Sequence, residues 1–231
     1  MVPGLHGRRE ECRLSGRESP PAAIVFDWDN TLVDTWPVIH EALLGTLQAM
    51  GHAPWTIEET RQRVRRSVRD AFPELFGDRW TEARRIFYDT FERIHIGRLL
   101  PLDDAAELLG ALSGAGIHLA VLSNKTGRYL RAEATHLGWT RFFGRLIGAG
   151  DACRDKPAPE SLELALATAP VGPGPEVWIV GDAGIDLEIA HRTGCVPVLV
   201  HRDAAEPEFA AWPPAHCFDG CRALLEYIRR W

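Results

Sequence analysis

Four short runs of consecutive apolar residues mark the chain, and a fifth run is weaker. Runs of this length that are rich in β-branched residues are typical of strands buried on both faces, as in a parallel sheet. Helix-like stretches alternate with the later runs, which predicts a doubly wound α/β sheet with its sites at the carboxyl ends of the strands. The predicted strands are residues 23–26, 118–122, 145–148, 177–180 and 196–200, and the helices among them are residues 129–137, 159–168 and 186–192.

The interval between the first two predicted strands contains no good strand and three helix-like segments. Pro37 opens the first segment and Gly51 closes it. Thr56 and Glu59 have the spacing of a capping box at the start of the second. This pattern predicts a small all-helical cap domain, residues 36–99, inserted over the edge of the sheet. Its predicted helices are residues 37–50, 57–70 and 81–96.

The remaining residues are assigned to a catalytic core and an N-terminal leader. Residues 22–35 and 100–231 are predicted to form the catalytic core. Residues 1–21 mix charge, glycine and proline without an apolar segment, which predicts a disordered leader and not a secretory signal. We also expect no membrane span, because no apolar run reaches the length of about 18 residues that a span requires.

Charge and cysteine content narrow the class of protein. The net charge is −6, with 26 basic and 32 acidic residues, which argues against nucleic acid or an anionic membrane as the main partner. The five cysteines are scattered and show no metal-type paired spacing. Reduced thiols are the default for such a pattern, so we expect a cytoplasmic protein.

The first candidate site follows the first predicted strand, where Asp27 and Asp29 lie two residues apart. Two carboxylates at the end of a buried strand are costly unless a cation compensates them. The alternative is a plain turn, since the residue types from Asp27 to Thr31 are also good turn and cap residues.

Three further polar segments also follow predicted strands. Ser123 and Asn124 offer a hydroxyl and an amide that can bind an anionic oxygen together with backbone N–H groups. Lys156 precedes a proline that would begin a helix. Asp182 and Asp186 are four residues apart and can share one face of a helix start. Alone, each segment also fits a structural role: a loop, a solvated lysine, or an N-cap formed by Asp186.

The four segments are more specific together than singly, because the carboxyl ends of parallel strands meet at one edge of the sheet. Four carboxylates gathered at one edge need a divalent cation, and ligands that are all oxygens favour magnesium over zinc. A serine, an asparagine and a lysine beside that cation suit a phosphate group. The sequence therefore predicts a Mg²⁺ site that binds a phosphate.

The order of these motifs, DxDxT, SN, K-P and GDxxxD, resembles the haloacid dehalogenase superfamily of phosphotransferases over about residues 22–231. The resemblance implies a Rossmann-like core, and the helical insert resembles the C1-type cap of the phosphoglycolate phosphatase-like branch. One departure is Asn30, where the family usually has glycine. Asparagine tolerates unusual backbone angles better than most residues, so we expect no loss of activity.

The resemblance also implies a role for each site residue. Asp27 is the nucleophile, Asp29 protonates the leaving oxygen and later deprotonates a water, and Lys156 offsets negative charge as a compact ammonium. The implied Mg²⁺ ligands are Asp27, Asp29 through its backbone carbonyl, Asp182 and Asp186, and the implied substrate-binding residues are Ser123, Asn124, Asn30 and Thr31.

These features predict a Mg²⁺-dependent phosphomonoester hydrolase that acts on a small phosphorylated metabolite through an aspartyl-phosphate, similar to phosphoglycolate phosphatase. The nearest alternatives are a nucleotidase and a sugar-phosphate phosphatase, followed by a phosphomutase, whose cap would have to exclude water. A non-catalytic binding or regulatory protein would have no chemical reason to keep so many mutually repulsive carboxylates. The predicted partner is a small-molecule phosphomonoester, with no nucleic acid and no membrane, while the oligomeric state is not readable.

Specificity for the leaving group is expected in the cap. One of Arg65, Arg66 and Arg69 could hold a second anionic group of the substrate, although a solvated helix face is the favoured alternative for most of these arginines. His40 and His95 are expected to be structural. The aromatic residues expected in the core of the cap are Phe72, Phe76, Trp80, Phe87 and Phe91.

Only two of the 26 basic residues are lysines. Lys156 occupies the position where the motif needs an ammonium group. Lys125 directly follows the predicted phosphate-binding residues, and two interpretations stay open for it: a supporting role at the phosphate or a solvated loop charge.

Overall fold

The computed structural model describes residues 19–63 and 68–231, and for residues 68–71 it describes the backbone. Most of the predicted leader lies outside the described residues, and so do Arg65, Arg66 and the side chain of Arg69.

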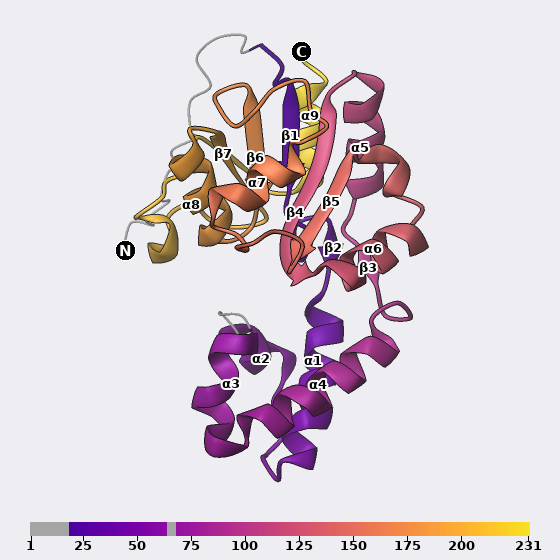
Figure 1. The fold of residues 1–231 in the computed structure, drawn as a ribbon, viewed down its shortest axis with the longest axis vertical. Helices are drawn as coiled ribbons and strands as arrows, with labels where there is room; N and C mark the ends of the chain where they lie inside the picture. Colours follow the sequence, from indigo (N-terminus) through magenta and orange to yellow (C-terminus); the bar gives the residue numbers. More distant parts are fainter. Residues whose placement is uncertain (1–18, 64–67) are drawn as a thin grey trace, which may run out of the picture.

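Six parallel strands form the central sheet in the order β5-β4-β1-β6-β7-β8 (Figure 1). The predicted α/β sheet is therefore confirmed, and the strand that follows the leader lies in its middle. The strands are β1 (Ala23–Phe26), β4 (His118–Thr126), β5 (Arg145–Ala149), β6 (Val177–Gly181), β7 (Val196–Val200) and β8 (His216–Phe218).

Helices cover both faces of this sheet, because alternate side chains of a strand point to opposite sides. In β1, Ile24 and Phe26 belong to one hydrophobic cluster, while Ala23 and Val25 belong to another. The first cluster includes residues of α5, α6 and α9, and the second includes residues of α7 and α8. These helices are α5 (Ala105–Gly114), α6 (Gly127–His136), α7 (Pro159–Ala165), α8 (Gly184–Thr193) and α9 (Cys221–Ile228), with short 3₁₀ helices at Thr140–Phe142 and Pro207–Phe209.

The helical insert forms a second body below the sheet in Figure 1. It has its own hydrophobic cluster, in which Phe72, Phe76, Phe87 and Phe91 are buried as predicted. Where one helix was predicted over residues 57–70, the structure has two helices on either side of the residues it does not describe. The helices are α1 (Trp36–Ala49), α2 (Ile57–Arg63), α3 (Val68–Phe76) and α4 (Trp80–Ile94), with a 3₁₀ turn at Gly77–Arg79.

Two short strands join the insert to the core. β2 (Val33–Asp34) and β3 (Leu100–Pro101) pair antiparallel, so the two connections to the insert run side by side. The exact division of the chain into a core and a cap stays a prediction. In the part of the chain that the structure describes, no helix is both long enough and apolar enough to cross a membrane.

The structure differs from the sequence prediction at β4. The predicted strand ends at residue 122, but β4 continues to Thr126, because its pairing with β5 resumes at Thr126 and Ala149 after an irregularity. Ser123 and Asn124 therefore lie in the last part of a strand and not in a loop. β8 was not predicted, since its three residues are too few to show a pattern.

Candidate functional site

The segment after β1 carries the first two carboxylates of the site. The backbone N–H of Asp27 donates to the carbonyl of Val180 at 2.8 Å, which extends the pairing of β1 with β6. The chain then turns at Asn30, whose φ of 57° lies in the left-handed region. Asparagine tolerates this region better than most residues, so it makes the turn in place of glycine.

The ammonium group of Lys156 lies between two carboxylates at the carboxyl end of the sheet. Its Nζ donates to Asp27 Oδ1 at 2.9 Å and to Asp186 Oδ1 at 2.5 Å. Burial alone would lower the pKa of Lys156, but the carboxylates of Asp186 and Asp27 outweigh this effect and raise the pKa. Lys156 therefore stays charged and supplies a fixed positive charge beside Asp27.

Asp27, Asp182 and Asp186 form an acidic group, with one carboxylate oxygen from each lying within 4.8 Å of the others. Burial raises the pKa of Asp27 to about 6, because the charged carboxylate loses its hydration. Burial also raises the pKa of Asp182 well above its ordinary value, and the charges of Asp27 and Asp186 add to this shift. One ammonium does not compensate three carboxylates, so the acidic group favours a further cation.

This acidic group fits the Mg²⁺ ion that the sequence predicts. Its donors are all carboxylate oxygens, which are the ligands that magnesium prefers. Gly181 makes room for it, because a Cβ atom at this position would lie 2.2 Å from the carboxyl group of Asp186. Among the described residues the carboxylate of Asp29 is not a member of the group, and metal binding through the backbone carbonyl of Asp29 stays a prediction.

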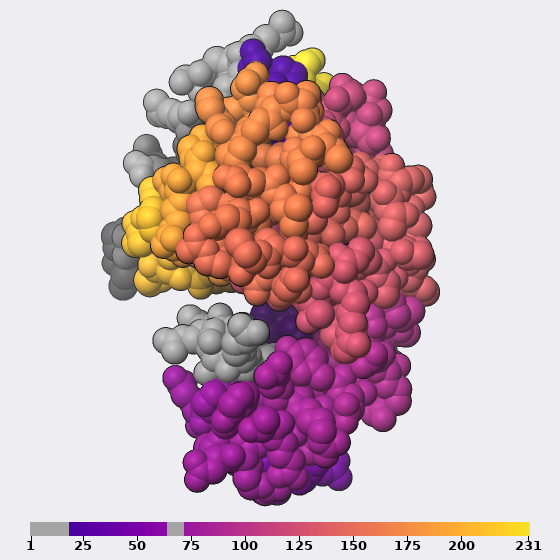
Figure 2. Space-filling model, in the orientation of Figure 1, coloured from indigo at the N-terminus to yellow at the C-terminus, as the bar shows by residue number. Residues whose placement is uncertain are grey.

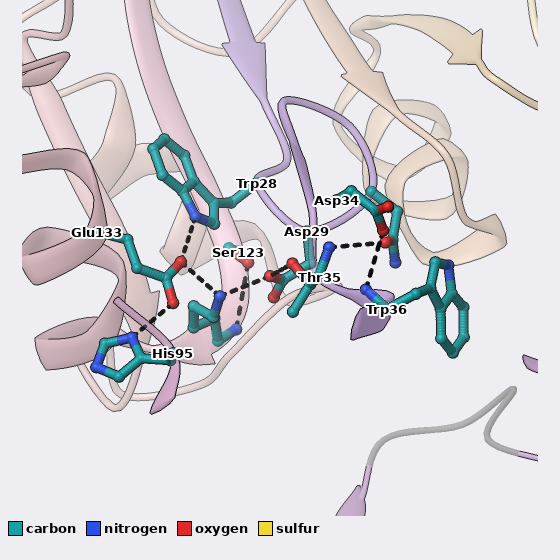
Figure 3. Close-up of polar contacts among 10 residues, drawn as sticks. Trp28, Asp29, Asp34, Thr35, Trp36, His95, Ser123 and Glu133 are labelled. Carbon is teal, nitrogen blue, oxygen red and sulfur yellow. Dashed lines mark hydrogen bonds and ion pairs between the residues drawn. The ribbon is translucent and has the colours of Figure 1, made fainter. Parts of the chain in front are cut away.

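The carboxylate of Asp29 has partners of its own. Lys125 Nζ donates to Asp29 Oδ1 at 2.7 Å, and the hydroxyl of Thr35 donates to the same oxygen (Figure 3). The side chain of Lys125 is only 4% exposed. The interpretation of Lys125 as a solvated loop charge is therefore wrong, and its ammonium group belongs to the site.

The predicted phosphate-binding residues lie beside these charges. Ser123 is buried, and its Oγ accepts the backbone N–H of Lys125 at 3.2 Å. Asn124 Nδ2 donates to the carbonyl of Lys156 at 3.0 Å, so this amide also fixes the segment that carries the lysine. The hydroxyl of Thr31 donates to Asp182 Oδ1 at 3.3 Å, which places Thr31 beside the acidic group. Substrate contacts of these residues stay a prediction.

A pocket of about 1030 Å³ opens between this edge of the sheet and the helical insert. Figure 2 shows the hollow between the purple insert and the orange part of the core. Residues from both bodies meet there, so a ligand in the pocket would contact the core and the insert together. From the core the lining includes Asp27, Asp29, Asn30, Ser123, Asn124, Lys156, Asp182 and Arg202, and from the insert it includes Arg61, Arg84, Phe87, Tyr88 and Phe91.

Two arginines of the insert were missed as candidates for contact with a ligand. Arg61 and Arg84 line the pocket, and neither forms an ion pair with a residue that the structure describes. Arg61 lies four residues before Arg65 in the sequence, close to the other arginines considered for substrate contact, whereas nothing in the sequence pattern distinguishes Arg84. Phe87 and Phe91, predicted as cap core, line the pocket as well.

Sequence reasoning also missed Glu133, which is buried on α6 beside the Asp29 segment. Its carboxylate accepts hydrogen bonds from Trp28, Lys125 and His95. Only the burial of Glu133 could have been predicted, because this residue occupies the same helix face as the apolar residues Tyr129 and Leu130. His95 is also buried, and the structural role expected for it stays a prediction.

The raised pKa values predict how the stability of the metal-free protein depends on pH. A carboxylate whose pKa is raised by folding stabilises the fold below its unfolded pKa, and this stabilisation is lost as the pH rises through the folded pKa. For Asp27 the loss falls between about pH 4 and pH 6. In EDTA at pH 8, we therefore expect Asp182→Asn to raise the free energy of unfolding above that of wild type.

Urea denaturation of both proteins at pH 5 and pH 8 measures this effect. At pH 5 the difference between them should shrink, because more of the wild-type carboxyl groups are protonated. An Asp182→Asn variant that is less stable than wild type in EDTA at pH 8 would contradict the assignment of uncompensated charge to the acidic group.

Comparison with known proteins places this geometry in a family. The model of the haloacid dehalogenase-like hydrolase family matches residues 24–200. A phosphoglycolate phosphatase from Agrobacterium fabrum is 31% identical over 223 residues, covering 87% of this chain and 94% of that protein. An N-acetylmuramic acid 6-phosphate phosphatase from Pseudomonas aeruginosa is 27% identical, covering 90% of this chain and 95% of that protein.

Solved structures agree with these relatives on the fold. A haloacid dehalogenase-like hydrolase from Streptococcus pneumoniae superposes with a TM-score of 0.79 at 22% identity, covering 90% of this chain and 98% of that one. The acidic group, the buried lysine and the parallel sheet thus occur in a chain that matches this family along most of its length. The chain belongs to the haloacid dehalogenase-like hydrolase family, and the enzyme class predicted from its sequence, a phosphatase, is confirmed.

Proposed function

We propose that the protein is a Mg²⁺-dependent phosphomonoester hydrolase that works through an aspartyl-phosphate on Asp27. The observation that carries the proposal is the convergence of Asp27, Asp182 and Asp186 around the buried ammonium of Lys156. This arrangement offers a nucleophile, a fixed positive charge and an oxygen-lined cation site within one pocket.

In the first step, a carboxylate oxygen of Asp27 attacks phosphorus, and the bond between phosphorus and the leaving oxygen breaks. Asp29 donates its proton to that leaving oxygen. In the second step, Asp29 takes a proton from a water whose oxygen attacks the phosphorus. The bond from phosphorus to Asp27 then breaks, which releases inorganic phosphate, restores the Asp27 carboxylate and leaves Asp29 protonated for the next cycle.

Asp27, Asp182, Asp186 and the backbone carbonyl of Asp29 would hold the metal. When bound, Mg²⁺ supplies positive charge that stabilises the phosphate oxygens as negative charge develops on them. Lys156 offsets the negative charge on the nucleophile Asp27, while Ser123 offers a hydroxyl to a phosphate oxygen.

The substrate is a small phosphorylated metabolite, and phosphoglycolate is the first candidate because several similar proteins are phosphoglycolate phosphatases. Arg61 and Arg84 support a substrate with a second anionic group, since both line the pocket without an ion-pair partner among the described residues. A sugar-phosphate phosphatase is the second candidate, because a pocket of about 1030 Å³ has room for far more than a two-carbon acid. The cytoplasmic location stays a prediction.

A panel of phosphomonoesters assayed with and without Mg²⁺ tests the proposal. We expect EDTA to lower phosphate release by at least about 10²-fold, because the acidic group loses its compensating cation, and added Mg²⁺ should restore it. The panel contains phosphoglycolate, N-acetylmuramic acid 6-phosphate, hexose phosphates and nucleoside monophosphates. Undiminished release in EDTA contradicts the metal dependence. If a hexose phosphate or a nucleotide has a much higher kcat/KM than phosphoglycolate, the first substrate candidate is wrong.

A further inference from the structure

Glu133 of α6 lies at the centre of a buried polar network behind the site. Its side chain is 1% exposed, and Figure 3 shows Trp28 and His95 pointing toward its carboxylate. Trp28 Nε1 donates to Oε2 at 2.7 Å, Lys125 Nζ donates to Oε2 at 2.6 Å, and His95 Nδ1 contacts Oε1 at 2.8 Å. A buried carboxylate requires such partners, but none of these contacts belongs to the acidic group that fits the metal.

The contact with Trp28 fixes the backbone between the two reacting carboxylates. Trp28 separates Asp27 from Asp29 in the sequence and is fully buried in the hydrophobic cluster that also holds Phe26. Its ring packs on Trp139 at 5.8 Å between centroids, while its only polar atom is fixed by Glu133. The direction in which the Asp29 side chain leaves the backbone therefore depends on this indole.

The contact with Lys125 fixes the carboxylate of Asp29 itself. Lys125 Nζ bridges Glu133 Oε2 and Asp29 Oδ1, and it also lies 5.5 Å from the centroid of the Phe91 ring. A lysine side chain has many rotamers, and the ion pair with Glu133 restricts Lys125 to few of them. Without Glu133, Lys125 would populate more rotamers, and its ammonium group would lie beside Asp29 less often. Glu133 thus determines where the positive charge beside Asp29 lies.

The two oxygens of Asp29 are consequently different. Oδ1 accepts from Lys125 and from Thr35. Within the described residues no hydrogen bond to Oδ2 is formed, and Asp29 lines the pocket. Oδ2 is then the oxygen that is available to carry the proton exchanged with a leaving group or a water.

We propose that Glu133 is a positioning residue for the acid–base step, which holds Trp28 and Lys125 so that Asp29 Oδ2 faces the leaving oxygen. This inference rests on the proposed function, because it needs Asp29 to act as the proton donor. His95, which directly follows α4, joins the end of the helical insert to the same carboxylate.

The test is the dependence of Glu133→Gln on the leaving group. A general acid matters most when the leaving group is a strong base, so its misplacement should affect phenyl phosphate more than 2,4-dinitrophenyl phosphate. We expect kcat/KM to fall about 30-fold or more for phenyl phosphate and less than about 3-fold for 2,4-dinitrophenyl phosphate. An equal loss for both substrates, or no loss for either, overturns the proposal, because a merely structural role does not discriminate between leaving groups.

Glu107→Gln is the matched control. Glu107 lies on α5, pairs with Arg229 at the surface and has a 57% exposed side chain, so the same chemical change there should leave both kcat/KM values within about twofold of wild type. If Glu133→Gln does not fold, the double variant Lys125→Gln, Glu133→Gln is used, because it removes both charges and leaves neither unpaired. The same selective loss is expected for it, and an equal loss for both substrates again overturns the proposal.

Asp29→Asn separates this inference from the proposed function. If Asp29→Asn loses activity equally for both aryl phosphates, Asp29 is not the general acid, and the proposed function and the inference fail together. If Asp29→Asn discriminates between them and Glu133→Gln does not, the inference alone fails. In the Asp29→Asn background, Glu133→Gln should add less than about a further threefold loss for phenyl phosphate, because both changes remove the same step.

Discussion

Replacing Asp27 with asparagine should lower kcat for an aryl phosphate by at least about 10⁴-fold, because the amide oxygen is too weak a nucleophile to form the aspartyl-phosphate. The fold should survive this change. The pKa of Asp27 is raised to about 6, so at pH 8 the native carboxylate is held charged at a cost that the neutral amide does not have. Phosphate release and urea denaturation at pH 8, both compared with wild type, measure the two effects.

Together the two measurements make the result for Asp27→Asn interpretable. Loss of turnover in a variant that is at least as stable as wild type in EDTA assigns the effect to chemistry. A variant that keeps the wild-type turnover shows that Asp27 is not the nucleophile, whatever its stability.

The second large effect is expected at Lys156. Lys156→Arg should lower kcat by about 10³-fold, because a planar guanidinium does not fit the place of a compact ammonium whose side chain is 2% exposed. Lys156→Met should lower the free energy of unfolding by about 3 kcal/mol or more in EDTA, because Asp27 and Asp186 both lose their cationic partner. Steady-state kinetics and chemical denaturation check these values.

Arg192→Lys is the control, because it exchanges arginine and lysine at a position outside the site. Arg192 pairs with Glu188 on the surface of α8, and its side chain is 49% exposed, so we expect kcat within about twofold of wild type. A Lys156→Arg variant that is as active as Arg192→Lys would show that the site needs a positive charge but not an ammonium group.

The main features of the site could be predicted because Asp27 and Asp182 directly follow buried apolar strands, and Lys156 lies in the loop after another strand. In a parallel sheet the carboxyl ends of the strands lie at one edge. The positions of Asp27, Lys156 and Asp182 relative to the predicted strands were therefore enough to predict that these residues lie close together. Asp182 and Asp186 were also predictable as a pair, since residues four apart can share one face of a helix start.

Residues whose role depends on how a helix packs could not be predicted in the same way. Lys125 follows Ser123 and Asn124 in the sequence, but its burial is decided by the position of α6 and by the ring of Phe91. The role of Glu133 appears only when α6 lies against the Asp29 segment. Arg84 shares this difficulty, because its presence at the pocket depends on the angle between the insert and the core.

The central place of β1 has a consequence for how the molecule folds. Of the strands that the structure describes, β1 is synthesised first, and both of its neighbours in the sheet, β4 and β6, follow only after the whole helical insert. During translation the apolar β1 segment thus has two unpaired edges while the insert is already complete and can bury its own aromatic residues. The insert should fold first and the sheet later, since long-range parallel pairing is slow. The carboxylates of Asp27 and Asp29 acquire their lysine partners only in that late stage, so the capacity for chemistry is among the last properties that the chain gains.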